Sequence, residues 1–248
     1  MNKPDFITKN DWVLLSEKYP NEIDKIVRKI NRGYPIQYLI GSVDFFGCKI
    51  LVSKDVLVPR FETELFVDII IKKINQLFIN PQIKIIDLGT GSGCIAIKLK
   101  DTFNLAEVIA IDKSKKALKV AKQNSDLNKT NIIFKHQTFK QIKEQNIDVI
   151  VSNPPYIGLF DEVDPNVRKF EPKNALFALN KGMFYYNQIL KKSQKIINEK
   201  FLICFEIGHK QAQNITNLAN RYFPTSTIEV IQDYNGKDRF VFITNISQ

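Results

Sequence analysis

Residues 83–94 read IKIIDLGTGSGC, and this stretch decides the fold. The apolar run at 83–87 is typical of a buried strand, and a helical pattern, CIAIKLKDTF, begins at Cys94 directly after the glycines. Glycines at a strand-to-helix turn remove the Cβ atoms that would hold a ligand away from the backbone. The stretch therefore predicts an α/β domain with a ligand site at this turn. The candidate ligand-binding residues are Asp87, Gly89, Thr90, Gly91, Ser92 and Gly93.

Strand and helix patterns alternate along the rest of the chain. Strands are predicted at 83–87, 107–112, 131–134, 148–152, 200–207, 227–231 and 240–244. Apolar strands that are separated by helices form a mostly parallel sheet with right-handed crossovers. The last two strands are joined without a helix, so they predict an antiparallel edge. We therefore expect a seven-stranded, mostly parallel sheet.

The first 60 residues follow a different pattern. Residues 9–33 predict two short helices that end at Gly33, and 45–50 predict a β-hairpin. A helical pattern then covers 64–78 and is expected to stop at Pro81. The predicted organisation is a short helical region at 1–36, a β-hairpin linker at 37–60 and an α/β domain at 61–248.

Composition and the spacing of the cysteines exclude several classes of protein. With 248 residues and 44% hydrophobic content, the chain can bury a full core. Cys48, Cys94 and Cys204 form no CxxC pair, and only two histidines accompany them, which excludes a zinc cluster and a disulfide framework. No apolar run predicts a signal peptide or a membrane span, so we expect a cytoplasmic protein.

The formal net charge of +10 allows two interpretations. A basic surface would favour a polyanionic partner such as nucleic acid. Alternatively, the abundance of lysine, isoleucine and asparagine reflects the codon usage of an AT-rich genome. In support of this, lysine greatly outnumbers arginine, although arginine is the residue that recognises phosphate more specifically. Charge alone leaves both open.

Asp112 ends the second predicted strand of the α/β domain. A carboxylate at this place can accept hydrogen bonds from both ribose hydroxyls of a nucleoside. It can also cap the helix that starts near Ser114, and one residue can serve both purposes.

The tetrapeptide Asn153-Pro154-Pro155-Tyr156 follows the predicted strand 148–152. Two prolines lock the backbone where it leaves the carboxyl edge of the sheet, which is the edge where open α/β sheets bind ligands. This rigidity fixes the Asn153 amide and the Pro154 carbonyl as acceptors aimed at one point, with the Tyr156 ring as a wall.

Together, the glycine turn, Asp112 and the tetrapeptide resemble class I S-adenosylmethionine-dependent methyltransferases that modify planar NH2 groups. The resemblance implies a Rossmann-like fold, S-adenosyl-L-methionine as cofactor and no metal. It implies that Asn153, Pro154, Pro155 and Tyr156 are catalytic, and that Asn153 and Phe139 join the glycine turn and Asp112 around the cofactor. Two targets share this tetrapeptide: the amino groups of nucleic-acid bases and the glutamine side chain of proteins.

Motifs on both sides of this core resemble bacterial release factor glutamine methyltransferases. They are RGYPIQYLIG (32–41), FFG (45–47) and VPRFETE (58–64) upstream, and FEPKNAL (170–176), EIG (206–208) and DYNGKDR (233–239) downstream. The resemblance implies N5-methylation of the glutamine in the Gly-Gly-Gln loop of peptide chain release factors, which supports translation termination. It also implies a monomer that needs no nucleic acid and a substrate-recognition role for 1–36. Arg60 and Thr63 become substrate-binding candidates beside residues 153–156.

The chain departs from the family pattern at three places. Phe61 stands where the family usually has proline, Thr138 replaces an acidic residue near the adenine, and the N-terminal region is short. Phe139 can still stack on the purine. Helix capping is the alternative role of Thr63 and of Glu64. We interpret Glu206 as structural.

Several different functions stay open at this point. A sister family methylates a glutamine of a ribosomal protein, and more distant relatives methylate adenine in nucleic acids. Sequence-specific DNA enzymes need a target-reading domain, but only residues 157–248 follow the tetrapeptide, and most of them complete the sheet. A structure-specific RNA methyltransferase is compatible with the sequence, and so is a binding module without catalysis.

Overall fold

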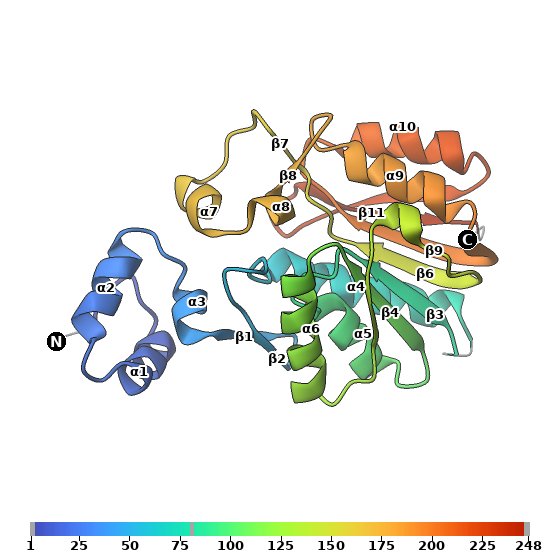
Figure 1. Cartoon of the computed structure of the whole chain (residues 1–248). Helices are drawn as coiled ribbons and strands as arrows, with labels where there is room; N and C mark the ends of the chain where they lie inside the picture. The colour runs from blue at the N-terminus through green and yellow to red at the C-terminus, as the bar shows by residue number, and fades with distance from the viewer. Residues whose placement is uncertain (1–2, 80–81, 246–248) are drawn as a thin grey trace.

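A seven-stranded sheet forms the centre of the molecule in the computed structural model, which describes residues 3–79 and 82–245 (Figure 1). The strand order is β10-β11-β9-β6-β3-β4-β5. The strands are β3 (Lys84–Leu88), β4 (Glu107–Asp112), β5 (Ile133–His136), β6 (Ile147–Ser152), β9 (Ile197–Glu206), β10 (Thr227–Gln232) and β11 (Asp238–Thr244). All seven predicted strands are therefore present.

The strand directions confirm the predicted fold class. β5, β4, β3, β6 and β9 run parallel, and β11 is antiparallel to both β9 and β10. The boundaries of β5 and β9 differ from the prediction because the neighbouring strands set them. β5 spans Ile133–His136, two residues later than predicted, since it pairs with β4 up to Asp112. β9 begins at Ile197, where it pairs with Ile147 of β6.

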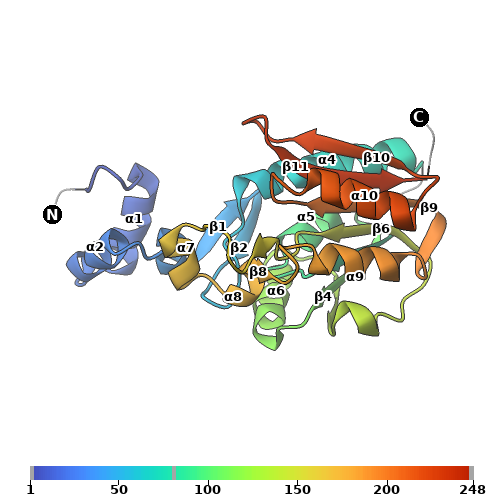
Figure 2. The same ribbon diagram turned by 90° about the horizontal axis from the view of Figure 1, so that it is seen from above.

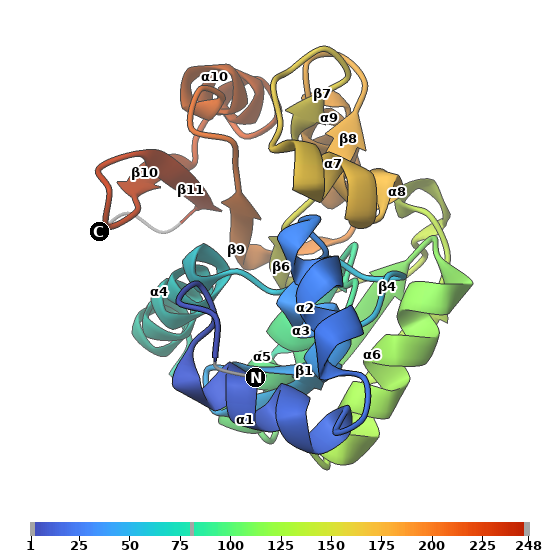
Figure 3. The ribbon, with the colours of Figure 1, turned by 90° about the vertical axis from the view of Figure 1, so that its left-hand side faces the viewer.

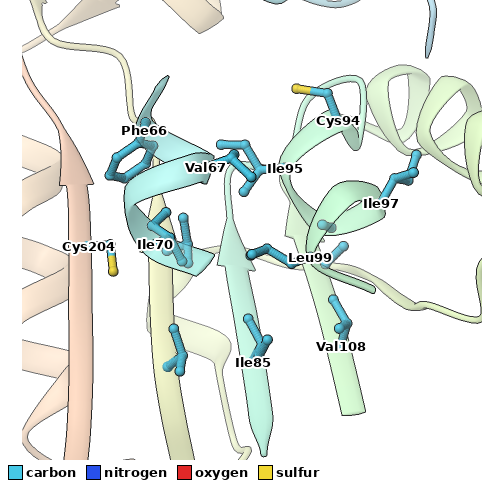
Figure 4. Packing of buried hydrophobic residues seen from close by; sticks show 14 of the residues in the cluster. Phe66, Val67, Ile70, Ile85, Cys94, Ile95, Ile97, Leu99, Val108 and Cys204 are labelled. Atoms are coloured by element: carbon cyan, nitrogen blue, oxygen red, sulfur yellow. The ribbon is translucent and has the colours of Figure 1, made fainter. Parts of the chain in front are cut away.

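Helices cover both faces of the sheet (Figure 2). The helices α4 (Phe61–Leu77), α5 (Cys94–Thr102) and α6 (Lys115–Leu127) pack on one face, and α9 (Phe184–Ser193) and α10 (Ala212–Tyr222) pack on the other. Figure 4 shows Phe66 and Ile70 of α4 and Leu99 of α5 against strand residues such as Ile85. Burial on both faces explains the continuous apolar runs in the strands. Pro81, the predicted end of the first of these helices, lies outside the described residues.

The three N-terminal helices form a separate small cluster. They are α1 (Lys9–Lys18), α2 (Ile23–Asn31) and α3 (Ile36–Ile40). The hairpin of β1 (Ser42–Phe45) and β2 (Cys48–Leu51) follows them and packs on the main core instead. The hairpin was predicted, but α3 was not. Its β-branched sequence is held as a helical turn because Leu39 packs against Leu15 and Ile26, and Gly41 closes the helix in the left-handed conformation. Figure 3 views the molecule from the side of this cluster.

A second unpredicted feature is an insertion between β6 and α9. It contains β7 (Ile157–Gly158), α7 (Pro165–Phe170), α8 (Lys173–Leu176) and β8 (Phe177–Ala178), while the short 3-10 helix η1 (Phe139–Gln141) precedes β6. The rings of Tyr34 and Phe170 meet edge to face at 5.2 Å, which joins the N-terminal region to this insertion. Within the described ranges, no helix is long and apolar enough to cross a membrane.

Candidate active site

The glycine turn has the geometry of a ligand cradle. Gly89, Gly91 and Gly93 have φ angles of 78°, 57° and 84°, in the region that favours glycine. Among the described atoms, none lies within 4 Å of a Cβ built on Gly89, and the nearest to one on Gly91 is a backbone oxygen at 3.9 Å. A Cβ on Gly93 would instead be 3.1 Å from the Cβ of Ala121. The first two glycines thus face open space, while the third lets α5 pack on α6.

Asp87 supports this turn from below. Its carboxylate is 1% exposed and accepts a 2.6 Å hydrogen bond from the Thr90 hydroxyl. Burial raises the pKa of Asp87 to about 7, and the charge of Asp112 acts in the same direction, while the hydrogen bond from Thr90 lowers the pKa. Asp87 therefore holds the turn in shape rather than facing the cavity above it.

Asp112 lies beside the turn at the end of β4. Its two carboxylate oxygens accept hydrogen bonds from the backbone N–H groups of Gly91 at 3.0 Å and Ser114 at 2.8 Å. The alternative that Asp112 caps the next helix is wrong, because the Ser114 hydroxyl accepts from the N–H of Ala117 and is itself the N-cap of α6. Each oxygen of Asp112 keeps a second lone pair for a ligand.

A cavity of about 550 Å³ lies above the glycine turn. Of the predicted site residues, nine line it: Thr63, Gly89, Thr90, Gly91, Ser92, Asp112, Phe139, Asn153 and Pro155. The structure thus places the predicted cofactor residues and the predicted target residues around one space. Asp87, Gly93, Arg60, Pro154 and Tyr156, all within the described residues, lie outside this lining.

Several lining residues were missed by the sequence analysis. They come from the linker (Lys54, Asp55, Val56, Leu57, Pro59), the segment after β5 (Gln137), the insertion (Pro172, Asn174, Ala175) and α9 (Phe184, Tyr185, Gln188). The motifs at 58–64 and 170–176 were available signals, because they contain Pro59, Pro172, Asn174 and Ala175. Nothing in the local pattern of 184–188 distinguishes it from an ordinary helix start.

Asn153 follows directly on β6, whose last residue ties two strand ends together through a 2.6 Å hydrogen bond from the Ser152 hydroxyl to the Leu88 carbonyl. The Asn153 side-chain N–H donates to the Thr63 hydroxyl oxygen at 3.5 Å. Thr63 donates in turn to the buried Glu206 carboxylate at 2.8 Å. Asn153 is therefore tied to α4 and β9 at its nitrogen end.

Tyr156, the last residue of the tetrapeptide, is anchored through its backbone. Its carbonyl accepts a 2.8 Å hydrogen bond from the Gln211 amide. Burial raises the pKa of the Tyr156 phenol to about 12, and the charge of Glu206 acts in the same direction. The phenol is thus neutral at physiological pH, and its role as a wall for the target stays a prediction.

Arg60, the N-cap of α4, and Thr63, in the first turn of α4, point to different partners. Arg60 forms an ion pair with the buried Glu171 of the insertion, which holds the insertion against the linker. Thr63 turns its hydroxyl to Glu206, so the helix-capping alternative is wrong for Thr63. Glu64 accepts a hydrogen bond from the backbone of Phe46 and faces the hairpin.

The residues after β5 form the far wall of the cavity. The Thr138 hydroxyl donates to the Gln141 side chain at 3.0 Å within a capping box, so Thr138 caps the N-terminal end of η1. The Phe139 ring meets Tyr185 edge to face at 5.6 Å. The side-chain nitrogen of Gln137 is buried and has no hydrogen-bond partner in the part of the chain that the structure describes. A buried donor of this kind is costly unless a ligand satisfies it.

Comparison with known proteins identifies the family. Residues 63–201 match the family model described as "Methyltransferase small domain". The release factor glutamine methyltransferase of Enterococcus faecalis is 37% identical over 93% of this chain and 85% of its own length. The enzyme of that name from Lactococcus lactis is 34% identical over 96% of this chain and 89% of its own length. The chain belongs to the release factor glutamine methyltransferase family.

The solved structures agree with this fold. A Thermus thermophilus 16S rRNA methyltransferase, solved with AdoMet and guanosine, has a TM-score of 0.59 at 13% identity and covers 83% of this chain and 50% of that one. Both the predicted fold, that of a class I methyltransferase, and the predicted family are confirmed. The roles of the individual site residues and the division at 36 and 60 stay predictions.

Proposed function

We propose that this chain transfers a methyl group from S-adenosyl-L-methionine to N5 of the glutamine in the Gly-Gly-Gln loop of peptide chain release factors. The observation that carries this proposal is the shared cavity, which is lined by Asn153 as well as by Asp112 and the glycine turn. A methyl donor and a target amide must meet in one space for direct transfer. The relatives' names supply the release factor as the target class.

The residues around the cavity suit this cofactor. Gly89 and Gly91 leave room for close approach to the backbone, and Asp112 keeps free lone pairs for ribose hydroxyls. Phe139 offers a ring edge or face to the adenine, and the buried Gln137 nitrogen offers a hydrogen bond that no described residue takes up. When bound, S-adenosyl-L-methionine supplies an electrophilic methyl group.

The chain's own task is then to orient the glutamine. An amide nitrogen is a poor nucleophile because its lone pair is delocalised into the carbonyl. The Asn153 side-chain oxygen and the Pro154 carbonyl accept the two N–H bonds of the target, which turns its lone pair toward the methyl group. Positioning of this kind can supply about 7–11 kcal/mol of a barrier. No general base is needed at the outset, since the alkylated nitrogen is acidic and loses its proton afterwards.

Residues 1–36 serve substrate recognition, because they form their own small cluster and contact the insertion through Tyr34 and Phe170. The linker at 37–60 connects this cluster to the catalytic domain at 61–248. The enzyme acts as a monomer in the cytoplasm, where release factors work, and needs no nucleic acid.

A methyl-transfer assay with radiolabelled donor tests this function. Purified release factor, its Gln→Ala loop variant, total ribosomal protein and total RNA are offered in parallel. We expect label on the wild-type release factor and not on its loop variant. Label on ribosomal protein or on RNA alone would overturn the substrate assignment, and label on none of them would contradict the proposed activity.

A further inference from the structure

A buried chain of three polar groups reaches from the interior to the target side of the cavity. Glu206 is 3% exposed at the end of β9 and accepts a 2.8 Å hydrogen bond from the Thr63 hydroxyl. Thr63 is also 3% exposed and accepts from the Asn153 side-chain nitrogen at 3.5 Å. The Asn153 amide additionally lowers the pKa of Glu206 through a hydrogen bond of its own. Asn153 alone of the three groups belongs to the proposed catalytic set.

The direction of these hydrogen bonds fixes the direction of the Asn153 amide. A threonine hydroxyl has one hydrogen, and an ionised carboxylate can only accept. Thr63 must therefore give its hydrogen to Glu206, and its oxygen can only accept from Asn153. If the amide were turned over, its oxygen would face the Thr63 oxygen with no hydrogen between them. The nitrogen of Asn153 is thus held inward, and its oxygen is the edge left for the cavity.

We propose that Glu206 is a positioning residue, which acts through Thr63 to hold the Asn153 amide with its oxygen toward the target glutamine. This role rests on the proposed function, because only a target that donates N–H groups needs an acceptor at this place. An Asn153 amide turned the other way would direct its N–H groups at the N–H groups of the target, and no hydrogen bond could form. From the sequence alone Glu206 is interpreted as structural, because it lies at the end of a predicted buried strand. Its contact with Thr63 links positions 143 residues apart, which no sequence pattern reveals.

The surroundings of Glu206 make the orientation of the Asn153 amide sensitive to pH. Burial raises its pKa to about 7, against the hydrogen bond from Thr63, the positive charge of Arg239 and the hydrogen bond from Asn153, while the charge of Glu62 adds to the rise. The other titratable groups that interact with it are Cys94, Tyr156 and Tyr186. Asp233 holds Arg239 at 3.2 Å and limits how far that charge can act.

Protonation of Glu206 removes the constraint. The carboxylic acid can then donate to the Thr63 oxygen, and the Thr63 hydrogen becomes free to point at the Asn153 oxygen. Both orientations of the amide are then accommodated, so the share of correctly oriented enzyme falls. We therefore expect the turnover number to drop as the pH falls through the pKa of Glu206, and this acid limb to depend on Glu206.

Three variants test the role in catalysis. Thr63→Val keeps the shape of the side chain and removes the hydroxyl, Thr63→Ser keeps the hydroxyl, and Glu206→Gln keeps the shape and removes the charge. We expect Thr63→Val to lower kcat about 100-fold, the loss that a misplaced reacting group typically causes, with KM for the release factor unchanged. The melting temperature also falls, because the buried Glu206 carboxylate loses a hydrogen-bond donor, so kcat is measured well below it. Thr63→Ser should restore most of the lost rate. Glu206→Gln should lower kcat and abolish the acid limb.

A second measurement needs no substrate. The side-chain amide resonances of Asn153 are followed by 15N–1H NMR as the pH crosses the pKa of Glu206, in the wild type and in Glu206→Gln. We expect them to move in the wild type and to stay fixed in the variant. If the wild type methylates no release factor, the proposed function fails while this measurement still decides whether Glu206 controls the amide.

Either of two results would overturn the positioning role. One is a Thr63→Val enzyme with wild-type kcat, or one whose loss lies only in KM or in the melting temperature. The other is a set of Asn153 amide resonances that respond to pH identically in the wild type and in Glu206→Gln.

Discussion

Asn124 and the backbone of Leu51 exchange two hydrogen bonds, of 2.7 Å to the Asn124 oxygen and 3.0 Å from its nitrogen. The same amide nitrogen donates to the Ser92 carbonyl at 2.9 Å. One fully buried side chain of α6 therefore ties the end of the hairpin to the glycine turn. This contact holds the linker residues that line the cavity at a fixed spacing from the glycine turn.

Removal of the Asn124 amide should be costly. Asn124→Ala leaves the partly buried N–H and C=O of Leu51 and the buried Ser92 carbonyl without their partner, and an unsatisfied buried group costs on the order of 1–3 kcal/mol. We expect a loss of about 3 kcal/mol in the free energy of unfolding, measured with urea. The control is Asn128→Ala at the C-cap of α6, whose side chain makes one exposed contact with the Lys49 carbonyl and one part-buried contact with the Asn124 carbonyl. Equal losses in the two variants would contradict the bracing role of Asn124.

Gly93 is required for two reasons that a matched pair of variants can separate. Gly93→Ala places a residue at φ +84° and a Cβ 3.1 Å from that of Ala121. Gly47→Ala imposes nearly the same φ, +82°, in open space in the hairpin turn. We expect Gly47→Ala to cost about 1 kcal/mol of strain and Gly93→Ala about 3 kcal/mol in urea unfolding. If the two variants lose the same stability, close packing of α5 on α6 is not what demands glycine.

Asp112 should govern affinity for the methyl donor. Asp112→Asn keeps the size of the side chain but replaces one acceptor oxygen by a donor, which then faces the backbone N–H of either Gly91 or Ser114 and can no longer accept from a ribose hydroxyl. We expect binding of S-adenosyl-L-methionine to weaken by about 10-fold or more in isothermal calorimetry, equivalent to about 1.4 kcal/mol. Asp126→Asn, on the exposed side of α6, is the control. Unchanged affinity in Asp112→Asn would remove Asp112 from the donor site.

Asp87 should make stability depend on pH. Its folded-state pKa is raised from 3.8 to about 7, so between these values the folded protein keeps a proton that the unfolded chain releases. The free energy of unfolding that Asp87 contributes is therefore largest below its unfolded pKa and is lost as the pH rises through its folded pKa. Comparison with Asp87→Asn by urea unfolding at several pH values isolates this effect. The stability of the wild type relative to the variant should increase as the pH falls from about 7 to about 4; a constant difference would contradict the raised pKa.

The sequence was most informative where the chemistry lies in a contiguous segment. The glycine turn at 89–93 and the tetrapeptide at 153–156 each combine a strand end with residues of restricted backbone, so both could be placed at the carboxyl edge before the structure was known. Asp112 followed from the same topology. The structure then brought these segments around one cavity, as the parallel order of β3, β4 and β6 requires.

The contacts that were missed depend on tertiary packing. Asn124 has the sequence context of any polar residue in a helix, and its importance appears only when β2 is packed on α6. Arg60 and Glu171 lie 111 positions apart, and no periodicity links them. α3 forms because Leu39 is buried in the N-terminal cluster, against the strand preference of its own sequence.

A comparison of the wild type with Asn153→Ala tests the proposed mechanism most directly. Wild-type enzyme and Asn153→Ala are each incubated with a release factor and S-adenosyl-L-methionine, and the peptide that contains the Gly-Gly-Gln loop is sequenced by mass spectrometry, with donor affinity measured in parallel. We expect one added methyl group on the glutamine side chain with the wild type, and loss of most of that product with Asn153→Ala at a donor concentration that saturates both enzymes. Methylation at any other residue, or a normal rate in the variant, would contradict the proposed mechanism.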